Sequence, residues 1–554
     1  MATKPERIPL AQPIQSRGPL FSTDSYSQNV VFEQNDAGMC VLKRPGLIDQ
    51  LISPEQYTPF VGYTVNRVLS IFDFHLTDKS VCTFAIIEWF ANPNYSIYIV
   101  NVSPATFPSP TGGSLNTIAA GSFNQSILTG ITPATNYNYI PVTAVPNLNP
   151  NTTFSLQPSP GDGSIWFVLN QFGSLYCLYI SYNGSTTCAF NLSPGIAQTS
   201  SSISPSRSVY LDNYIFFCSS NGAIFNTQLV PIPTTLNYYA SGSNPFAGVF
   251  TATNVIYTYG EFGDQIAIIK HLNYLIAFKE FSCEFYYDAG NPTGSTPGSP
   301  LGNYIQARQT IGCANQDSLC GFKDTIIWVG QGPMQGKSIY IMNGLVPTRI
   351  SNEYIDKYLD KDTCISVNAV TTQVAGHRLY ILSLLTLNVT LVYDFSTQQW
   401  YRWSGWTGSF DTVFPAIGSY VGKYDPNNQE YIWGKSPVTG LYRVYDLDAN
   451  TYQDNFVQIN VVIQTDTEDW GTRQPKTFGR LDVIADQQNN STLRISHSDD
   501  DFNTYSPVRT VDLSQQRPVL FQGGRARKRA YLIQHTANVP FRGEYLELDI
   551  KPGS

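Results

Sequence analysis

Residues 376–406 place the tightest limit on what this chain can fold into. They alternate β-prone runs with polar turns: apolar and β-branched residues fill 378–385 and 389–393, and Asn388 stands between them at a tight-turn position. Trp400 begins a third run after another polar turn. Such a unit brings no helix to cover it, so it must pack face to face on another sheet. The rest of the chain must therefore supply similar sheets.

Units of the same kind recur along the chain. The order Val-Tyr-Asp at 392–394 returns at 444–446, and Tyr-Tyr-Asp stands at 286–288. The spacing of about 50 residues between the first two is close to the repeat of a propeller blade. Because radial repetition hides sheet edges without helices, the pattern predicts an all-β chain with a β-propeller of six or seven degenerate blades. A pair of β-sandwiches is the alternative.

Changes in residue composition and in the pattern of strands divide the chain into three parts. An N-terminal arm with the first strands is expected over residues 1–55. The β-propeller is expected over 56–450, with insertions near 103–160, 230–263 and 289–303, where Pro, Gly, Ser, Thr and Asn accumulate. Alternating strands after residue 450 predict a C-terminal β-sandwich domain over 451–554. A single short helix is expected at 354–359, preceded by the capping sequence Ser-Asn-Glu.

Composition limits the function. Aromatic and charged residues each make up 13 % of the chain, and the formal net charge is −8. The net negative charge argues against a protein that binds nucleic-acid phosphates on a basic face. It is compatible with a channel wall past which DNA slides. Nine cysteines without a C-x-x-C pair indicate free thiols and folding in a reducing compartment. Because neither a signal-like segment nor a long apolar run occurs, we expect no secretion by a signal peptide and no membrane span.

One dense basic run stands near the end of the chain. It consists of Arg525, Arg527, Lys528 and Arg529. A solvated strand edge that resists aggregation is the simplest interpretation. The functional interpretation is a contact with DNA or with a neighbouring ring of an assembly, although so short a run has low specificity. Both interpretations stay open at this point.

Two acidic turns are the nearest approach to a metal site. Residues 498–505 approximate the Asp-box pattern S-x-D-x-G-x-T-W, with Phe502 in place of Gly and Tyr505 in place of Trp. These residues and the turn at 466–469 are expected to be plain acidic turns, with metal binding as the less favoured alternative. The histidines show no zinc-binding spacing, and nucleophile-elbow and P-loop patterns are missing. The sequence therefore predicts no catalytic residue, no cofactor and no metal.

Several short segments carry a resemblance through their order and spacing. They are S-Y-S-Q-N-V-V-F-E at 25–33, K-R-P-G-L at 43–47, N-Y-L-I-A-F at 273–278, S-I-Y-I-M at 338–342 and H-R-L-Y at 377–380. In this order they resemble the tail nozzle, or hub, proteins of short-tailed bacteriophages, also called packaged-DNA stabilisation proteins. The resemblance covers most of the chain and is weakest over 105–150.

This resemblance implies a structural virion protein of the phage tail that is assembled in the host cytoplasm. It implies a homohexameric nozzle below the portal and its adaptor, the head-to-tail connector. The channel would retain the packaged double-stranded DNA and conduct it during ejection without reading its sequence. The outer surface would hold fibres or tailspikes, and a tail needle is a further expected partner.

A glycan-binding or sialidase-like β-propeller is the alternative from a different class. The aromatic residues at 400–403 could stack on sugars, although packing in a blade core is the favoured interpretation. A sialidase-like enzyme would need arginines, a tyrosine and acids that converge on one propeller face. Because the sequence shows no such pattern, we expect a protein without enzymatic activity.

Overall fold

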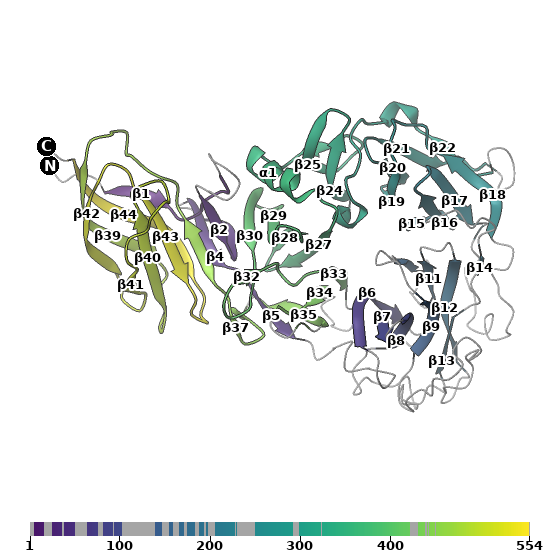
Figure 1. Ribbon diagram of the computed structural model, residues 1–554, viewed down its shortest axis with the longest axis horizontal. Coiled ribbons are helices and arrows are strands. Elements are labelled where there is room, and N and C mark those ends of the chain that lie inside the picture. The colour runs from purple at the N-terminus through teal and green to yellow at the C-terminus, as the bar shows by residue number, and fades with distance from the viewer. Residues whose placement is uncertain are drawn as a thin grey trace.

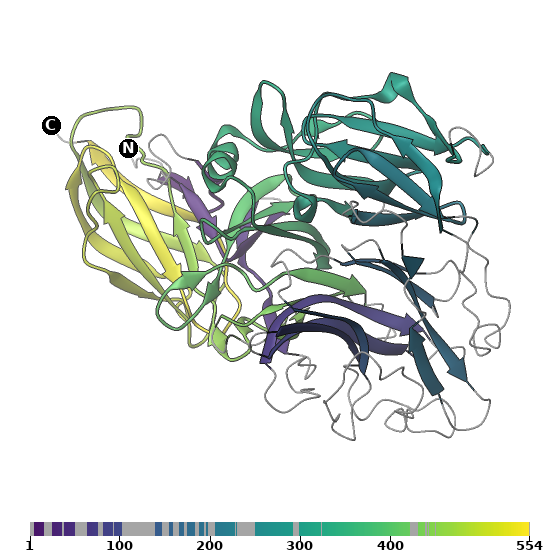
Figure 2. The ribbon, with the colours of Figure 1, turned by 45° about the vertical axis from the view of Figure 1, so that its right-hand side comes forward.

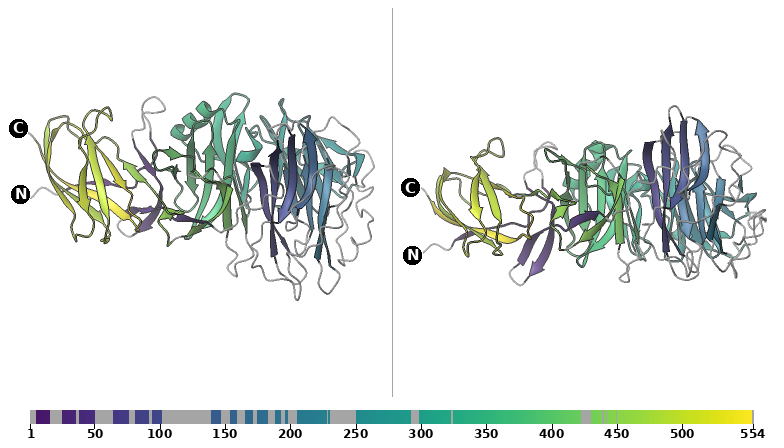
Figure 3. Two further views of the ribbon diagram at one scale, coloured as in Figure 1. Left: turned by 60° about the horizontal axis from the view of Figure 1, so that its bottom comes forward. Right: turned by 90° about the horizontal axis from the view of Figure 1, so that it is seen from below.

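The computed structural model describes residues 5–15, 25–35, 38–49, 64–75, 81–91, 94–101, 139–146, 154–158, 165–170, 174–182, 188–192, 196–197, 205–227, 229, 250–291, 298–322, 324–421, 430–437, 440, 442–448 and 450–552. Nearly every element in them is a β-strand, which confirms the expected all-β class. The molecule is elongated, with a ring of sheets at one end and a C-terminal domain at the other (Figure 1). Both views in Figure 3 show the same two parts in line along the long axis.

Six sheets of the ring are formed by strands that follow one another along the chain. Blade 1 contains β6 (Thr64–His75), β7 (Val81–Ala91), β8 (Asn94–Asn101) and β9 (Tyr139–Pro146). Blade 2 contains β10 (Phe154–Pro158), β11 (Ile165–Asn170), β12 (Ser174–Tyr182), β13 (Cys188–Leu192) and β14 (Ile196–Ala197). Blade 3 contains β15 (Pro205–Leu211), β16 (Tyr214–Ser219), β17 (Ala223–Thr227) and β18 (Phe250–Tyr257). Blade 4 contains β19 (Gln265–His271), β20 (Tyr274–Lys279), β21 (Cys283–Asp288) and β22 (Leu301–Asn303). Blade 5 contains β23 (Cys320–Phe322), β24 (Thr325–Gly332), β25 (Gln335–Met342) and β26 (Thr348–Arg349). Blade 6 contains β27 (Val367–Val374), β28 (His377–Leu384), β29 (Val389–Asp394) and β30 (Gln399–Trp403).

Blade 7 is completed by a strand that precedes blade 1. Its sheet continues from β33 (Gly418–Val421), β34 (Glu430–Lys435) and β35 (Tyr442–Asp448) to β5 (Gly46–Asp49), which pairs antiparallel with β35. Strand β33 also contacts β6, so the last blade meets the first and the ring is closed. Because a closed ring of sheets leaves few free strand edges, no covering helices are needed. The described strands thus form a seven-bladed propeller, within the expected six or seven blades.

Helix α1 (Glu353–Asp362) lies between blades 5 and 6. The Asn352 side chain caps it by accepting hydrogen bonds from the backbone N–H groups of Tyr354 and Ile355. Ile355 and Leu359, one turn apart, are buried against the propeller. The expected helix is therefore confirmed. Two short 3₁₀ turns, Ile305–Ala307 and Gln316–Ser318, occur in the connection between blades 4 and 5.

Blade strands extend into the ranges that the sequence marked as insertions. Strands β9 and β10 lie within 103–160, and β18 lies within 230–263. Residues 103–138 and 231–249 are outside the described residues, as are 292–297 of the third range. Strand β9 contains two prolines and is the outermost strand of blade 1, where a missing backbone donor costs little. The composition of this segment therefore predicts a loop, although the segment pairs as a strand.

The C-terminal domain consists of two packed sheets. The first runs through β38 (Val461–Gln464), β43 (Ala530–His535), β40 (Thr492–Ser498) and β41 (Arg509–Asp512). The second runs through β42 (Val519–Ala526), β39 (Lys476–Ala485) and β44 (Arg542–Pro552), and continues to β4 (Gly38–Lys43) and β3 (Val30–Asn35). Strand β1 (Glu6–Pro9) pairs with β44. The domain therefore includes N-terminal strands as well as the residues after 450 from which the sequence predicted it.

The N-terminal segment also joins the two parts of the molecule. Strand β2 (Tyr26–Gln28) pairs with β30 of blade 6 on one side and with β38 on the other, which makes one continuous sheet across the junction. A single apolar core includes Ile533 of the C-terminal domain, Val31 of β3 and Val392 of blade 6. Hairpin β31 (Gly405–Trp406) and β32 (Asp411–Thr412), with β36 (Gln453–Asp454) and β37 (Val457–Gln458), completes the junction. Figure 2 shows the purple N-terminal strands between the ring and the yellow C-terminal domain.

Among the described residues, no helix is long and apolar enough to cross a membrane.

Candidate functional site

The basic run lies at the end of the C-terminal domain, where β42 turns into β43. Arg525 is near the end of β42, opposite Thr477 of β39, and Lys551 of β44 lies opposite the same threonine. All three side chains are exposed, so they share the outer face of the sheet. Arg527 is exposed in the turn that follows. The register thus adds Lys551 to the surface that the sequence indicated.

Lys476 holds this surface in place from beneath. Its side chain is buried, and its ammonium donates hydrogen bonds to the carbonyl oxygens of Thr472, Gln474 and Arg527. These bonds fix the loop that carries the exposed Arg473 beside the turn that carries Arg527. We call Arg473, Arg525, Arg527 and Lys551 the basic end. No ion pair involves these four side chains within the described part of the chain.

Arg529 does not belong to the basic end, and its assignment as a surface contact needs correction. Its guanidinium is buried, pairs with Asp499 at 2.7 Å, donates to the Gly523 carbonyl at 2.6 Å and stacks 4.0 Å from the centre of the Phe478 ring. Its backbone forms an isolated antiparallel β-bridge with Glu468. The residue sits just before β43, where the strand direction turns the side chain between the two sheets. Arg529 is therefore a buried, paired side chain inside the domain.

Lys528 is paired as well. Its ammonium contacts the Asp501 carboxylate, and both side chains are substantially exposed. Exposed pairs of this kind contribute little stability because water competes for both charges. Of the four residues that the sequence singled out, Arg525 and Arg527 are thus the two that are exposed and have no ion pair within the described ranges.

The acidic turn at 498–505 is built from internal hydrogen bonds. The Asp500 carboxylate accepts bonds from the Thr504 hydroxyl and backbone N–H and from the Ser498 hydroxyl. These bonds, that of the Thr504 hydroxyl foremost, lower the pKa of Asp500 to about 2. Phe502 has a positive φ of 68° at the position where the Asp-box pattern has glycine. Each carboxylate of 499–501 therefore already has a partner in the fold.

The second acidic turn is bonded in a similar way. Asp466 accepts a hydrogen bond from the Thr467 backbone, and Asp469 accepts one from the Gly471 backbone. The described residues contain no group of three or more His, Cys, Asp or Glu side chains that could hold a metal ion.

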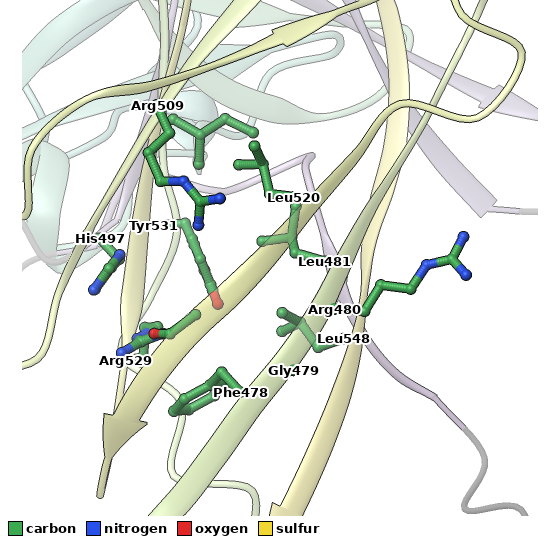
Figure 4. Close-up of a pocket in the computed structure, with 12 residues that line it drawn as sticks. Phe478, Gly479, Arg480, Leu481, His497, Arg509, Leu520, Arg529, Tyr531 and Leu548 are labelled. Carbon is green, nitrogen blue, oxygen red and sulfur yellow. The ribbon is translucent and has the colours of Figure 1, made fainter.

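A small cavity opens between the sheets of the C-terminal domain beside the basic end (Figure 4). Its volume is about 30 Å³. Phe478, Leu481, Ile495, Leu520 and Leu548 supply apolar walls, and His497, Arg509, Arg529 and Tyr531 supply polar groups. Burial and the charge of Arg529 lower the pKa of His497, so its ring is neutral near pH 7. The sequence offered no signal for this cavity, because its walls come from six separate strands.

A second buried basic group lies at the junction of the two parts. The Arg44 guanidinium is fully buried and pairs with both Asp454 oxygens, at 2.8 and 2.5 Å. Its remaining donors bond to Asn29 and to the carbonyl oxygens of Pro45 and Ser404, so all five N–H groups are used. The neighbouring Lys43 is buried too and donates to the Ala537 carbonyl.

The aromatic cluster at 400–403 is part of the core. Trp400, Tyr401 and Trp403 are buried, and Trp403 donates a hydrogen bond to the Val30 carbonyl. The ring of Tyr401 packs edge-on against Phe32 of the N-terminal segment. These side chains therefore present no stacking platform for a sugar.

Comparison with known proteins adds one informative match. Residues 253–414, which span blades 4 to 6 and their flanks, match the family described as "Bacteriophage P22 Gp10, beta-propeller". No curated protein matches the chain. Among solved structures, Sqt1 of Chaetomium thermophilum is 10 % identical, with a TM-score of 0.35, over 76 % of this chain and 95 % of that one.

A second structure, the exo-β-1,3-galactanase of Phanerochaete chrysosporium, is 7 % identical, with a TM-score of 0.26, over 72 % of this chain and 95 % of that one. At these scores neither structure supports an inference about this chain. The family match, on blades of a closed seven-bladed ring, supports a structural tail protein of a bacteriophage and a component of the virion.

Proposed function

We propose that this chain is a subunit of a homohexameric phage tail nozzle that extends the DNA channel below the portal and its adaptor. The match of residues 253–414 to a phage propeller family carries this proposal. In it, the nozzle retains packaged DNA, conducts it during ejection and offers its outer surface to fibres or tailspikes.

The fold suits a wall that must keep its shape. The propeller is closed by β5, which lies before the first blade in sequence and within the last blade in space. Strand β2 and a shared apolar core then tie the ring to the C-terminal domain. A large apolar interface between two parts of a chain opposes their relative motion. Each subunit would therefore enter the assembly as one rigid body.

The basic end has a role in this proposal. Its four cations have no ion pair among the described residues, and they belong to a chain in which Asp and Glu outnumber Lys and Arg, 41 to 33. Local positive charge can contact DNA phosphates or an acidic neighbouring ring, while the acidic remainder of the wall keeps the polymer from adhering. Arg525 and Arg527 would make these contacts, together with Arg473 and Lys551.

The first experiment measures the mass of the purified protein by light scattering and its symmetry by electron microscopy, alone and with the adaptor protein. A six-fold ring with an axial hole is expected in at least one condition. A chain that stays monomeric in both would overturn the nozzle proposal.

A pair of variants tests the basic end. Arg525→Glu/Arg527→Glu is expected to weaken ring assembly or the retention of packaged DNA. Lys270→Glu/Arg494→Glu reverses two exposed charges elsewhere and serves as the control. If the first variant assembles and retains DNA as well as the control, the basic end has no such role.

We further propose that the chain has no catalytic activity. The burial of the aromatic cluster at 400–403 supports this proposal, because a glycan-binding platform needs exposed rings. A panel of fluorogenic glycosides is expected to remain uncleaved, and turnover of any member would contradict it.

A further inference from the structure

The cavity of the C-terminal domain opens where its two sheets have their free edges. Strand β41 is the last strand of one sheet and β42 is the last strand of the other. Arg509 of β41 and Leu520 of β42 both line the cavity. Figure 4 shows the Arg509 guanidinium pointing into the space between Tyr531 and Leu520, whereas Arg480 points away.

The pairing register explains why Arg509 faces inward. Arg509 lies opposite Ile495 of β40, and Ile495 is buried on the inner face of the sheet. Side chains of directly paired residues lie on the same face. Val511, two residues later on β41, is buried too, whereas Thr510 between them is exposed. Because side chains alternate between the two faces along a strand, Arg509 occupies an inward position where apolar residues normally lie.

The cavity keeps an excess of positive charge. Arg480 pairs with Asp482 at 2.8 Å, and Arg529 pairs with Asp499. Within the described residues, no hydrogen bond or ion pair to a protein atom involves the Arg509 guanidinium. In this part of the described fold the free charge therefore belongs to Arg509, whereas the Tyr531 hydroxyl lies toward Arg529 (Figure 4).

Size and lining select the ligand. A cavity of about 30 Å³ accommodates two or three water-sized groups, since about 10–15 Å³ is needed for one. It is far below the several hundred Å³ of sites for sugars or nucleotides. The leucine walls favour an aliphatic stem over a bare hydrated ion. A guanidinium beside them favours a carboxylate.

We propose that this cavity binds a carboxylate carried on a short aliphatic stem, with Arg509 as its ionic partner. The same chemistry is offered by a Glu or Asp side chain of another protein chain and by a free small carboxylate such as propionate. The simpler role of Arg509 is to place a charge inside an edge strand and so prevent its pairing with other strands. That role needs no ligand.

The test uses propionate and its neutral analogue propionamide on the full-length chain. Methyl NMR of the leucines that line the cavity reports on occupancy. Propionate is expected to shift these signals saturably in the millimolar range, and propionamide is expected not to. Arg509→Gln should weaken propionate binding at least tenfold, whereas Arg494→Gln on the outer face of the neighbouring strand should leave it within twofold. Equal shifts with both ligands, or binding unchanged in Arg509→Gln, would overturn the proposal.

The source of the carboxylate is tested separately, and this step alone rests on the nozzle proposal. If propionate binds the monomer but not the assembled ring, and Arg509→Gln weakens the ring, an acidic side chain of a neighbouring copy is the ligand. If propionate binds both forms equally, the ligand is a free carboxylate. A chain that forms no ring leaves the NMR result on the monomer intact, so the two proposals fail independently.

Discussion

Two basic sequences, Lys43-Arg44 and the run at 525–529, are similar in composition but differ in how far the fold buries them. Both residues of the first are buried at the junction between propeller and C-terminal domain. The second is divided, because Arg529 is buried between the sheets while Arg525 and Arg527 remain exposed. Burial of a guanidinium requires that its donors be satisfied, and both Arg44 and Arg529 have a carboxylate partner.

The difference lies in what surrounds each sequence. Arg44 lies where β4, the last blades and the strands after residue 450 converge, so several elements can supply acceptors at once. Arg525 lies at the end of an edge strand, where one side is solvent. The comparison teaches that a basic run indicates a surface only if the local sheet has a free face. Four substitutions test this difference between the two basic sequences.

Arg44→Ala should have the largest effect. The substitution leaves Asp454 without its ion pair and removes three further hydrogen bonds of a buried guanidinium. Removing one partner of a buried pair typically costs about 3–5 kcal/mol. Chemical denaturation compares this variant with Arg494→Ala, an exposed arginine. A loss below about 1 kcal/mol would mean that the junction does not depend on this pair.

Lys43 should make stability depend on pH. Burial and the adjacent Arg44 charge lower the pKa of its ammonium from 10.5 to about 7. Between these two values the unfolded chain binds the proton more tightly than the folded chain, so stability should rise with pH across this window. Denaturation midpoints of the wild type should climb from pH 7 to pH 10, and Lys43→Met should flatten the curve. Parallel curves for the two proteins would contradict the prediction.

Arg529→Met should have a smaller effect than Arg44→Ala. Its partner Asp499 keeps 36 % of its side chain exposed and can be hydrated once the pair is lost. We expect a loss of about 2 kcal/mol, between the values for exposed and buried pairs. Thermal unfolding of the full-length chain measures it, with Lys528→Met as the control for an exposed pair. Equal effects of the two variants would show that burial of Arg529 adds nothing.

Arg525→Ala/Arg527→Ala should have the smallest effect on stability. Neither side chain has an ion pair in the described fold, and exposed substitutions usually change stability by less than about 0.5 kcal/mol. The same denaturation series measures it. A loss comparable to that of Arg529→Met would show that these side chains stabilise the domain as Arg529 does. They would then no longer belong to the basic end.

The all-β class, the recurrence of blades and the capped helix before blade 6 were predictable from the sequence. These features follow from local periodicity and turn chemistry, which each segment carries alone. The two acidic turns were predictable for the same reason, because Asp500 bonds to Ser498 and Thr504 within the same turn.

The exposure of individual basic residues, the closure of the ring and the position of the cavity depend on contacts between distant segments of the chain. Strand β5 joins β35 from almost 400 positions away, and β1, β3 and β4 join a sheet formed mainly by the end of the chain. Register between distant strands turns Arg509 inward and leaves Arg525 and Lys551 on one outer face. A shift of one residue would reverse these faces, and pairing across such distances is set by packing of the whole core.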